Sequence, residues 1–185
     1  MTPRRAVMFA AILVFVVALD QGSKAWARGL PVSPAGCDVP GDLIAHTCRG
    51  VPQPLIDGFW EWELAFNTGA AFSSFRGAQL LLGAFAAIAL IALGVMAWRA
   101  RPEQRLRRVA LAVIAGGALG NLIDRARDSA VTDFVRWRVG ELRWPIFNVA
   151  DVALIVGVGL FLIEGIAASR ASRASRASGQ ASAAT

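Results

Sequence analysis

Two aspartates in the second half of the chain have residue types and surroundings that could do chemistry. Asp133 follows Val131-Thr132, and Asp151 comes eighteen positions later in Phe147-Asn148-Val149-Ala150-Asp151. Asp151 opens an apolar run that reaches Ile163, and an ionisable group in such a run is costly enough to indicate function. Two carboxylates held close together share a proton, because repulsion raises one pKa, and the pair can activate water and polarise a carbonyl.

Other hydrolytic mechanisms lack the residues that they need. A zinc protease requires ligands such as those of a His-Glu-x-x-His helix, and the chain has one histidine, His46. A serine mechanism requires a base beside the nucleophile, and His46 has no evident serine partner in an apolar segment. The sequence therefore predicts paired-carboxylate hydrolysis, without a metal and without a cofactor.

The composition predicts a membrane protein. Of the 185 residues, 56% are hydrophobic, and the mean hydropathy is +0.52, which is too apolar for an ordinary soluble domain. The net charge of +6 could indicate a nucleic-acid partner, but the basic residues lie in short clusters beside apolar runs. That pattern orients a membrane protein, so we expect no nucleic acid among the partners.

The apolar runs predict an all-α membrane protein with four transmembrane helices, at about residues 6–27, 79–98, 107–123 and 145–166. They form one domain over residues 1–168, and the Ala-Ser-Arg repeats of 169–185 predict a disordered cytoplasmic tail. The first run also fits a cleaved signal peptide, since Ala25-Trp26-Ala27 resembles a cleavage site. Asp20 and Lys24, four residues apart, favour a continuing helix instead.

The connections between helices predict a small β element. Hydrophobic and acidic residues alternate from Trp60 to Phe66, which is typical of a half-buried strand. A second alternating stretch, residues 134–144, turns at Gly140-Glu141 and predicts a hairpin. Tryptophans in both stretches suit a membrane surface.

The basic loop from Arg99 to Arg108 predicts the orientation: this loop and both termini are cytoplasmic, and the two longer connections are outside. One level near the outer surface then collects the polar residues at the helix ends and in the outer loops: Asp20, Lys24, Asn67, Asn121, Asp124, Arg125, Asp133, Asn148 and Asp151. Such a layer of polar residues in a membrane protein indicates a functional site.

Five motifs in this order resemble lipoprotein signal peptidase, the bacterial signal peptidase II family: Asp20-Gln21-x-Ser23-Lys24, Asn67-Thr68-Gly69-Ala70-Ala71-Phe72, Gly116-Gly117-Ala118-Leu119-Gly120-Asn121-x-x-Asp124-Arg125, Val131-x-Asp133-Phe134 and Phe147-Asn148-x-Ala150-Asp151. The resemblance extends to about Ile163. It implies a monomeric aspartic endopeptidase of the bacterial inner membrane that cleaves the signal peptide from diacylglyceryl-modified prolipoproteins, N-terminal to the lipidated cysteine. Membrane lipid and peptide inhibitors of the globomycin type are further implied partners.

The resemblance also assigns roles. It implies that Asp133 and Asp151 are the catalytic dyad and that Asn121, Arg125 and Asn148 line it. The supporting positions are Asp20, Lys24, Asn67, Gly69 and Asp124, and the first outer connection supplies an extracytoplasmic β-cradle and a short surface helix. Asp124, at a helix end, is the rival of Asp133 as the partner of Asp151.

Simpler interpretations exist for several of these residues. Asn148 and Asp151 have the spacing of a helix N-cap and its acidic third residue. Asp20 and Lys24 could form an ordinary ion pair, and Arg125 could extend to the membrane surface. For the whole chain there are two alternatives: a four-span proton-coupled transporter and a non-catalytic membrane scaffold. A transporter would require charged residues near the bilayer midplane.

Two features depart from the family pattern. Thr132 replaces a valine before the loop aspartate, an exchange of similar shape that we expect to matter little. The first outer connection is enlarged around residues 37–48, and Cys37 and Cys48 predict a disulfide in an oxidising compartment. The alternative is two free thiols.

Overall fold

The computed structural model describes residues 2–33, 36–37, 41–44, 48–69 and 79–183. His46 and the glycine-alanine stretch after Gly69 lie outside the described residues. The described elements follow in the order α1 (Pro3–Ala27), β1 (Val32–Ser33), α2 (Gly41–Ile44), β2 (Arg49–Gly50), β3 (Gln53–Ile56), β4 (Trp60–Asn67), α3 (Gln79–Arg99), α4 (Arg105–Asp128), β5 (Val131–Val139), β6 (Leu142–Arg143) and α5 (Val149–Ala183).

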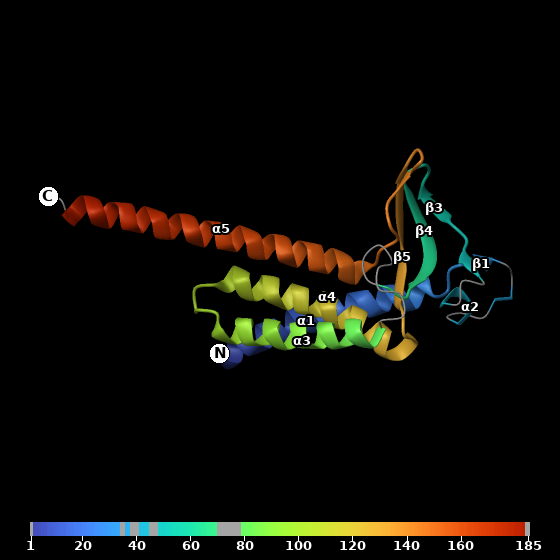
Figure 1. The fold of residues 1–185 in the computed structure, drawn as a ribbon, viewed down its shortest axis with the longest axis horizontal. Coiled ribbons are helices and arrows are strands. Elements are labelled where there is room, and N and C mark those ends of the chain that lie inside the picture. Colours follow the sequence, from blue (N-terminus) through green and yellow to red (C-terminus); the bar gives the residue numbers. More distant parts are fainter. Residues whose placement is uncertain (1, 34–35, 38–40, 45–47, 70–78, 184–185) are drawn as a thin grey trace.

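Four of the described helices, α1, α3, α4 and α5, are long and apolar enough to cross a membrane. Figure 1 shows them running in roughly one direction, with a small sheet standing across one end. Large apolar side chains on their outer surfaces are exposed, among them Leu80, Phe85 and Ile155, as lipid-facing residues would be. The predicted fold class, four apolar helices with a small β element, is confirmed.

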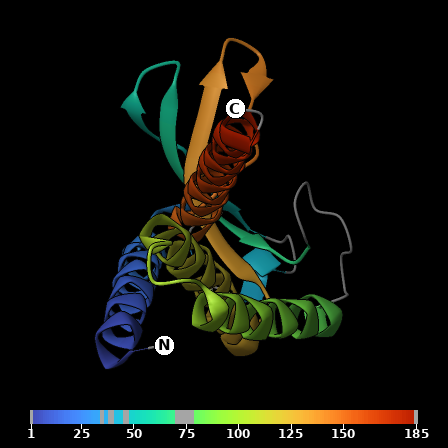
Figure 2. The same ribbon diagram turned by 90° about the vertical axis from the view of Figure 1, so that its left-hand side faces the viewer.

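Helix α4 is the centre of the helical part because it packs against α1, α3 and α5. Viewed along the helices, α4 lies between α1 and α3 (Figure 2). Glycines make the close approach possible, because any larger residue would clash. If Gly116 carried a Cβ atom, that atom would lie only 2.7 Å from the Cβ of Val16. A Cβ atom on Gly117 would lie only 2.6 Å from the carbonyl oxygen of Ala150. Close backbones bring the polar ends of these helices within hydrogen-bonding distance of one another.

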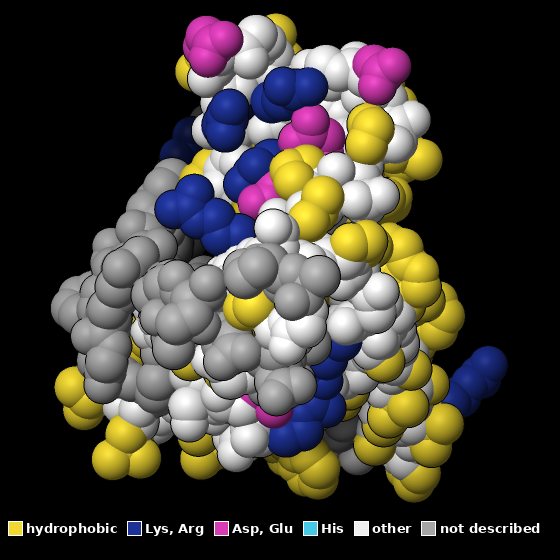
Figure 3. Space-filling view, turned by 90° about the vertical axis from the view of Figure 1, so that its right-hand side faces the viewer, with side chains coloured by type: hydrophobic (Ala, Val, Ile, Leu, Met, Phe, Trp, Pro, Cys, Tyr) yellow, Lys and Arg dark blue, Asp and Glu magenta, His cyan; other side chains and the backbone are white. Residues whose placement is uncertain are grey.

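The larger sheet has the strand order β3-β4-β5-β6 and antiparallel pairing. It confirms the predicted strand at Trp60–Phe66 and the hairpin around Gly140. Between Trp62 and Ala65 the register shifts by one residue, so that Ala65 pairs with Asp133. Basic and acidic side chains lie side by side in the upper part of Figure 3. Across strands β4 and β5, Arg136 pairs with Glu63 and Arg138 with Glu61.

The enlarged first connection is tied to this sheet. Cys37 and Cys48 form a disulfide with their Cα atoms 6.2 Å apart. Buried Leu43 and Cys48 pack with Leu64 and Phe66 of β4, while β1 pairs with β2. The described residues of the enlarged connection therefore share an apolar cluster with the strand that leads to Asn67.

The helix boundaries differ from the predicted ones. Helix α5 begins at Val149 rather than 145, because Asn148 caps it, and α4 continues to Asp128. In the described residues α5 remains helical to Ala183. Alanine and arginine favour helix, serine is tolerated, and the tail has no proline to end it. The disorder of residues 169–185 stays a prediction.

Candidate active site

Asp133 lies on β5 and is almost fully buried, with 3% of its surface exposed. The side-chain amide of Asn148 donates to its Oδ1 over 2.6 Å, and that of Asn67 donates to its Oδ2 over 3.2 Å. Burial, followed by the negative charge of Asp151, raises the pKa of Asp133 to about 8, although the two hydrogen bonds act in the opposite direction.

Asp151 is the third residue of α5, and Asn148 caps this helix. The Asp151 N–H donates to Asn148 Oδ1 over 3.0 Å, and the Asn148 N–H donates back to Asp151 Oδ2 over 3.1 Å. This reciprocal pair is a capping box. Asn121 of α4 donates to the other oxygen, Oδ1, over 3.0 Å. Capping and site formation are therefore not alternatives: one asparagine does both.

Asn148 connects the two carboxylates. Its amide nitrogen donates to Asp133 and, over 3.2 Å, to Asn121 Oδ1, while its oxygen and backbone N–H hold Asp151. Both Asn148 and Asp133 are buried, so the amide has little room for another arrangement. The helix cap thereby fixes the spacing between a strand carboxylate and a helix carboxylate.

Beneath the carboxylates lies a buried charged layer centred on Lys24 of α1. Its ammonium lies 2.8 Å from Asp20 Oδ2 and 3.1 Å from Asp124 Oδ2, and it donates to Asn121 Oδ1 over 2.9 Å. These three partners use all three protons of the ammonium. Lys24, Asp20 and Asp124 each have 0% of their surface exposed. The predicted i,i+4 ion pair is present, and it is part of a layer that supports Asn121.

The two aspartates of this layer also hold the neighbouring elements in place. Asp20 Oδ1 accepts the backbone N–H of Ala150, at the start of α5, over 3.0 Å. Asp124 Oδ2 accepts the backbone N–H of Thr132, next to Asp133, over 2.9 Å. Asp124 therefore positions the chain beside Asp133, and the hydrogen bonds of Asp151 go to Asn121 and Asn148.

Arg125 joins the first outer connection to α4. It donates to the carbonyl oxygens of Asn121 and Gly69, each over 3.3 Å, and the Gly69 N–H donates to Asn67 Oδ1 over 2.9 Å. The Nε of Arg125 is buried without a partner among the described residues. One hydrogen-bonded network therefore contains all of the predicted site residues: Asp20, Lys24, Asn67, Gly69, Asn121, Asp124, Arg125, Asp133, Asn148 and Asp151.

Further members of the network were not among the predicted site residues. Gln21 donates to Asp20 Oδ2, to Gly120 O and to Asp124 Oδ1, each over 3.1 Å. Arg28 donates to Asp128 and to the Thr132 hydroxyl, each over 2.8 Å. Arg28 lies four residues after Lys24, so helical spacing could have identified it. The threonine at 132 is also more than a shape replacement, because valine would offer Arg28 no acceptor.

The comparison with known families covers most of the chain. A family model described as signal peptidase (SPase) II matches residues 12–167. The chain belongs to the signal peptidase II family. Among similar proteins, this peptidase is 39% identical over 163 residues to the lipoprotein signal peptidase of Xanthomonas euvesicatoria pv. vesicatoria (strain 85-10), covering 84% of this chain and 86% of the relative. The lipoprotein signal peptidase of Xylella fastidiosa (strain M12) is 37% identical over 170 residues, covering 88% and 91%.

Solved structures agree with this assignment. A bacterial membrane enzyme solved by the in meso method at 2.3 Å resolution superimposes with a TM-score of 0.70 and 29% identity, covering 88% of this chain and 89% of that one. A second, at 1.9 Å resolution, gives a TM-score of 0.66 and 29% identity, with 84% and 90% covered. The signal peptidase II assignment predicted from five motifs is confirmed, and the chain is a multi-pass membrane peptidase.

Proposed function

We propose that this signal peptidase II is an aspartic endopeptidase in which Asp133 and Asp151 act on a water molecule as one pair. The observation that carries the proposal is that one residue, Asn148, holds both carboxylates: its side-chain amide donates to Asp133, and its backbone N–H donates to Asp151. The raised pKa of Asp133 supports a protonated partner at neutral pH. Asp151 suits the ionised role, since Asn121 and a backbone N–H donate to it and it lies in the first turn of α5.

The proposed reaction begins with ionised Asp151 accepting a proton from water while the water oxygen attacks the scissile carbonyl carbon. Protonated Asp133 donates to the carbonyl oxygen, so the tetrahedral intermediate is a neutral diol. The intermediate then collapses: Asp151 passes its proton to the amide nitrogen, the C–N bond breaks, and Asp133 recovers a proton from a hydroxyl group of the diol. Both carboxyl groups return to their starting states.

We propose prolipoproteins as substrates, in line with the relatives named lipoprotein signal peptidase. The bond cleaved lies N-terminal to a cysteine that carries diacylglyceryl. The carboxylates lie where β5 meets the start of α5, at the sheet end of the apolar helices (Figure 1). A lipidated cysteine could reach this level while its acyl chains stay in the bilayer. Globomycin-type peptides would compete for the same position.

We also propose the membrane and the orientation: the bacterial inner membrane, with the sheet end outside. The exposed arginines of the α3–α4 connection, Arg99, Arg101 and Arg105, lie with the N-terminus at the opposite end of the molecule (Figure 1). A basic end is retained on the cytoplasmic side. The network is closed within one chain, so we propose that a monomer is active.

The test is a processing assay with the full chain in lipid nanodiscs. Wild-type protein should cleave a diacylglyceryl-modified prolipoprotein and leave the unmodified precursor largely intact, and a globomycin-type peptide should inhibit it. Asp133→Asn and Asp151→Asn should each abolish cleavage while remaining folded. Wild-type rates in both variants would overturn the aspartic mechanism, equal cleavage of both precursors would overturn the lipid requirement, and ion flux without cleavage would favour a transporter.

A further inference from the structure

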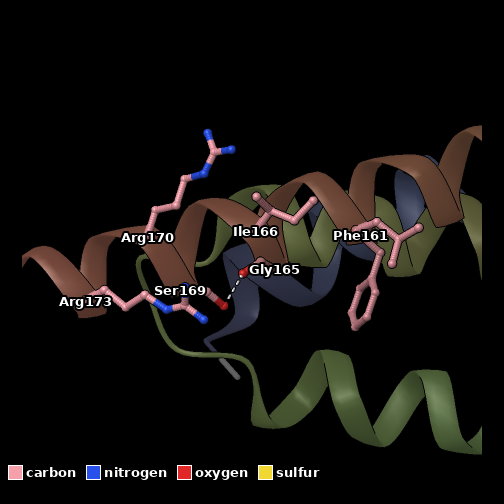
Figure 4. A pocket seen from close by; sticks show the side chains of 7 residues that line it. Phe161, Gly165, Ile166, Ser169, Arg170 and Arg173 are labelled. Atoms are coloured by element: carbon pink, nitrogen blue, oxygen red, sulfur yellow. Dashed lines mark hydrogen bonds between the residues drawn. The ribbon is translucent and has the colours of Figure 1, made fainter.

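A groove on α5, far from the carboxylates, combines apolar and basic side chains. Figure 4 shows its lining residues, all from this one helix: Phe161, Gly165, Ile166, Ser169, Arg170 and Arg173, with Leu162 beside them. Their spacing of one, three and four residues places them on one helical face. Because Asp151 is the third residue of α5, this stretch lies roughly 15 to 33 Å from it along the helix. Among the described residues, no hydrogen bond or ion pair joins the groove to the peptidase network.

The floor of the groove is apolar and open. Leu162 is 59% and Ile166 54% exposed, and Gly165 between them has nothing within 4 Å of the position that a Cβ would occupy. A glycine flanked by exposed large side chains leaves a hollow along the helix. Such a surface in a membrane span fits a hydrocarbon chain.

One end of the groove carries uncompensated positive charge. Arg170 and Arg173 are exposed, and neither forms an ion pair among the described residues. The nearby acid, Glu164, is already paired with Arg107 of α4 at 2.8 Å. Arg107 in turn lies 5.6 Å over the ring of Phe161. The acid therefore offers little repulsion to an incoming anion, and two guanidinium groups remain free to bind it.

The length of the groove matches one leaflet of a bilayer. From Phe161 to Arg170 and Arg173 the helix rises by about 14 to 18 Å, and half of the hydrocarbon core is about 15 Å thick. The last large apolar residue of α5 is Ile166, four residues before Arg170. The basic end thus lies where the apolar run of the helix gives way to lipid phosphates, and the apolar floor lies beside the acyl chains.

We propose that this groove binds one anionic phospholipid of the leaflet at the C-terminal end of the span, with its phosphate at the basic end that carries Arg170 and Arg173 and an acyl chain along Leu162 and Ile166. The charge complementarity selects anionic over zwitterionic lipid, because a free phosphate charge meets two unpaired guanidinium groups. The site is separate from the proposed peptidase mechanism, so either can fail without the other.

The experiment measures thermal unfolding of the full chain in neutral detergent with added phosphatidylglycerol, phosphatidylcholine or inorganic phosphate. Phosphatidylglycerol should raise the midpoint of the wild type, and the other two should not. Arg170→Gln with Arg173→Gln should weaken this response at least tenfold in lipid concentration. Gly165→Leu, which fills the hollow and keeps the charges, should do the same.

The matched control is Arg101→Gln with Arg105→Gln, which removes the same charge from exposed arginines at the same end of the molecule. It should keep the wild-type response, and all variants should cleave substrate at the wild-type rate in phosphatidylcholine. An equal loss in the control would show a general basic surface and overturn the site. An equal response to phosphatidylcholine, a response to inorganic phosphate alone, or no response to phosphatidylglycerol would also overturn it.

Discussion

Replacing Asn148 by serine separates helix capping from the positioning of the carboxylates. Serine caps a helix about as well as asparagine, so the Asp151 N–H keeps an acceptor. Serine has no amide, however, and the 2.6 Å hydrogen bond to Asp133 is lost. Asn121 Oδ1 still accepts from Lys24. We therefore expect Asn148→Ser to fold and to lose catalytic rate.

The expected loss follows from the hydrogen bond that is removed. Asp133 is neutral in the proposed mechanism, and a hydrogen bond between neutral groups is worth about 0.5–1.5 kcal/mol, while about 1.4 kcal/mol corresponds to a factor of ten in rate. We expect kcat to fall by about 2- to 10-fold, with KM less affected because the substrate contacts are unchanged. Asn148→Ala should lose the same rate and, in addition, about 1 kcal/mol of unfolding free energy through the lost cap.

The pH profile supplies a second measurement. The hydrogen bond from Asn148 lowers the pKa of Asp133, so its removal should move the alkaline limb of kcat/KM to higher pH. The assay is steady-state cleavage of lipidated precursor across this limb, with thermal unfolding as the check on folding. A folded Asn148→Ser protein with the wild-type kcat and an unshifted limb would refute the idea that this amide holds the pair.

Three other predictions concern the same network. Wild-type kcat/KM should decline as pH rises through about 8, because Asp133 then loses the proton that polarises the carbonyl; a flat profile to about pH 10 would count against it. Lys24→Met should cost about 3–5 kcal/mol of unfolding free energy, since it leaves the buried Asp20 and Asp124 without their cation, and unfolding in detergent measures this. Gly117→Ala should cost about 1–3 kcal/mol by pushing α4 away from Ala150, whereas Gly159→Ala, with open space around it, should not destabilise.

Much of the site could be predicted because the sequence carries topology as well as motifs. Nothing local connects Asp133 with Asp151, but the order of apolar runs and the basic loop place both at one level. The family motifs favour Asp133 over Asp124 as the partner of Asp151, and this choice stays a prediction. In the structure Asp124 is occupied by Lys24, Gln21 and the Thr132 N–H.

Other features depend on contacts that no spacing rule encodes. The Asp20 hydrogen bond to the Ala150 N–H joins residues 130 positions apart, and the Arg28 bond to Thr132 joins residues 104 positions apart. Asn148 could be recognised as a cap, but its second contact, with Asp133, depends on how β5 passes the start of α5. The tail sequence does not decide between helix and disorder, because it is of low complexity and also consists largely of good helix formers.

The most direct measurement is the cleavage rate of Asp133→Asn, Asp151→Asn and the double variant, each shown to be folded by thermal unfolding. If the two carboxyl groups act as one unit, each single variant should lose at least about 10³-fold in kcat, and the double variant should lose no more than the worse single one. A double variant whose loss is the product of two independent losses, or a single variant near the wild-type rate, would contradict the shared-proton pair.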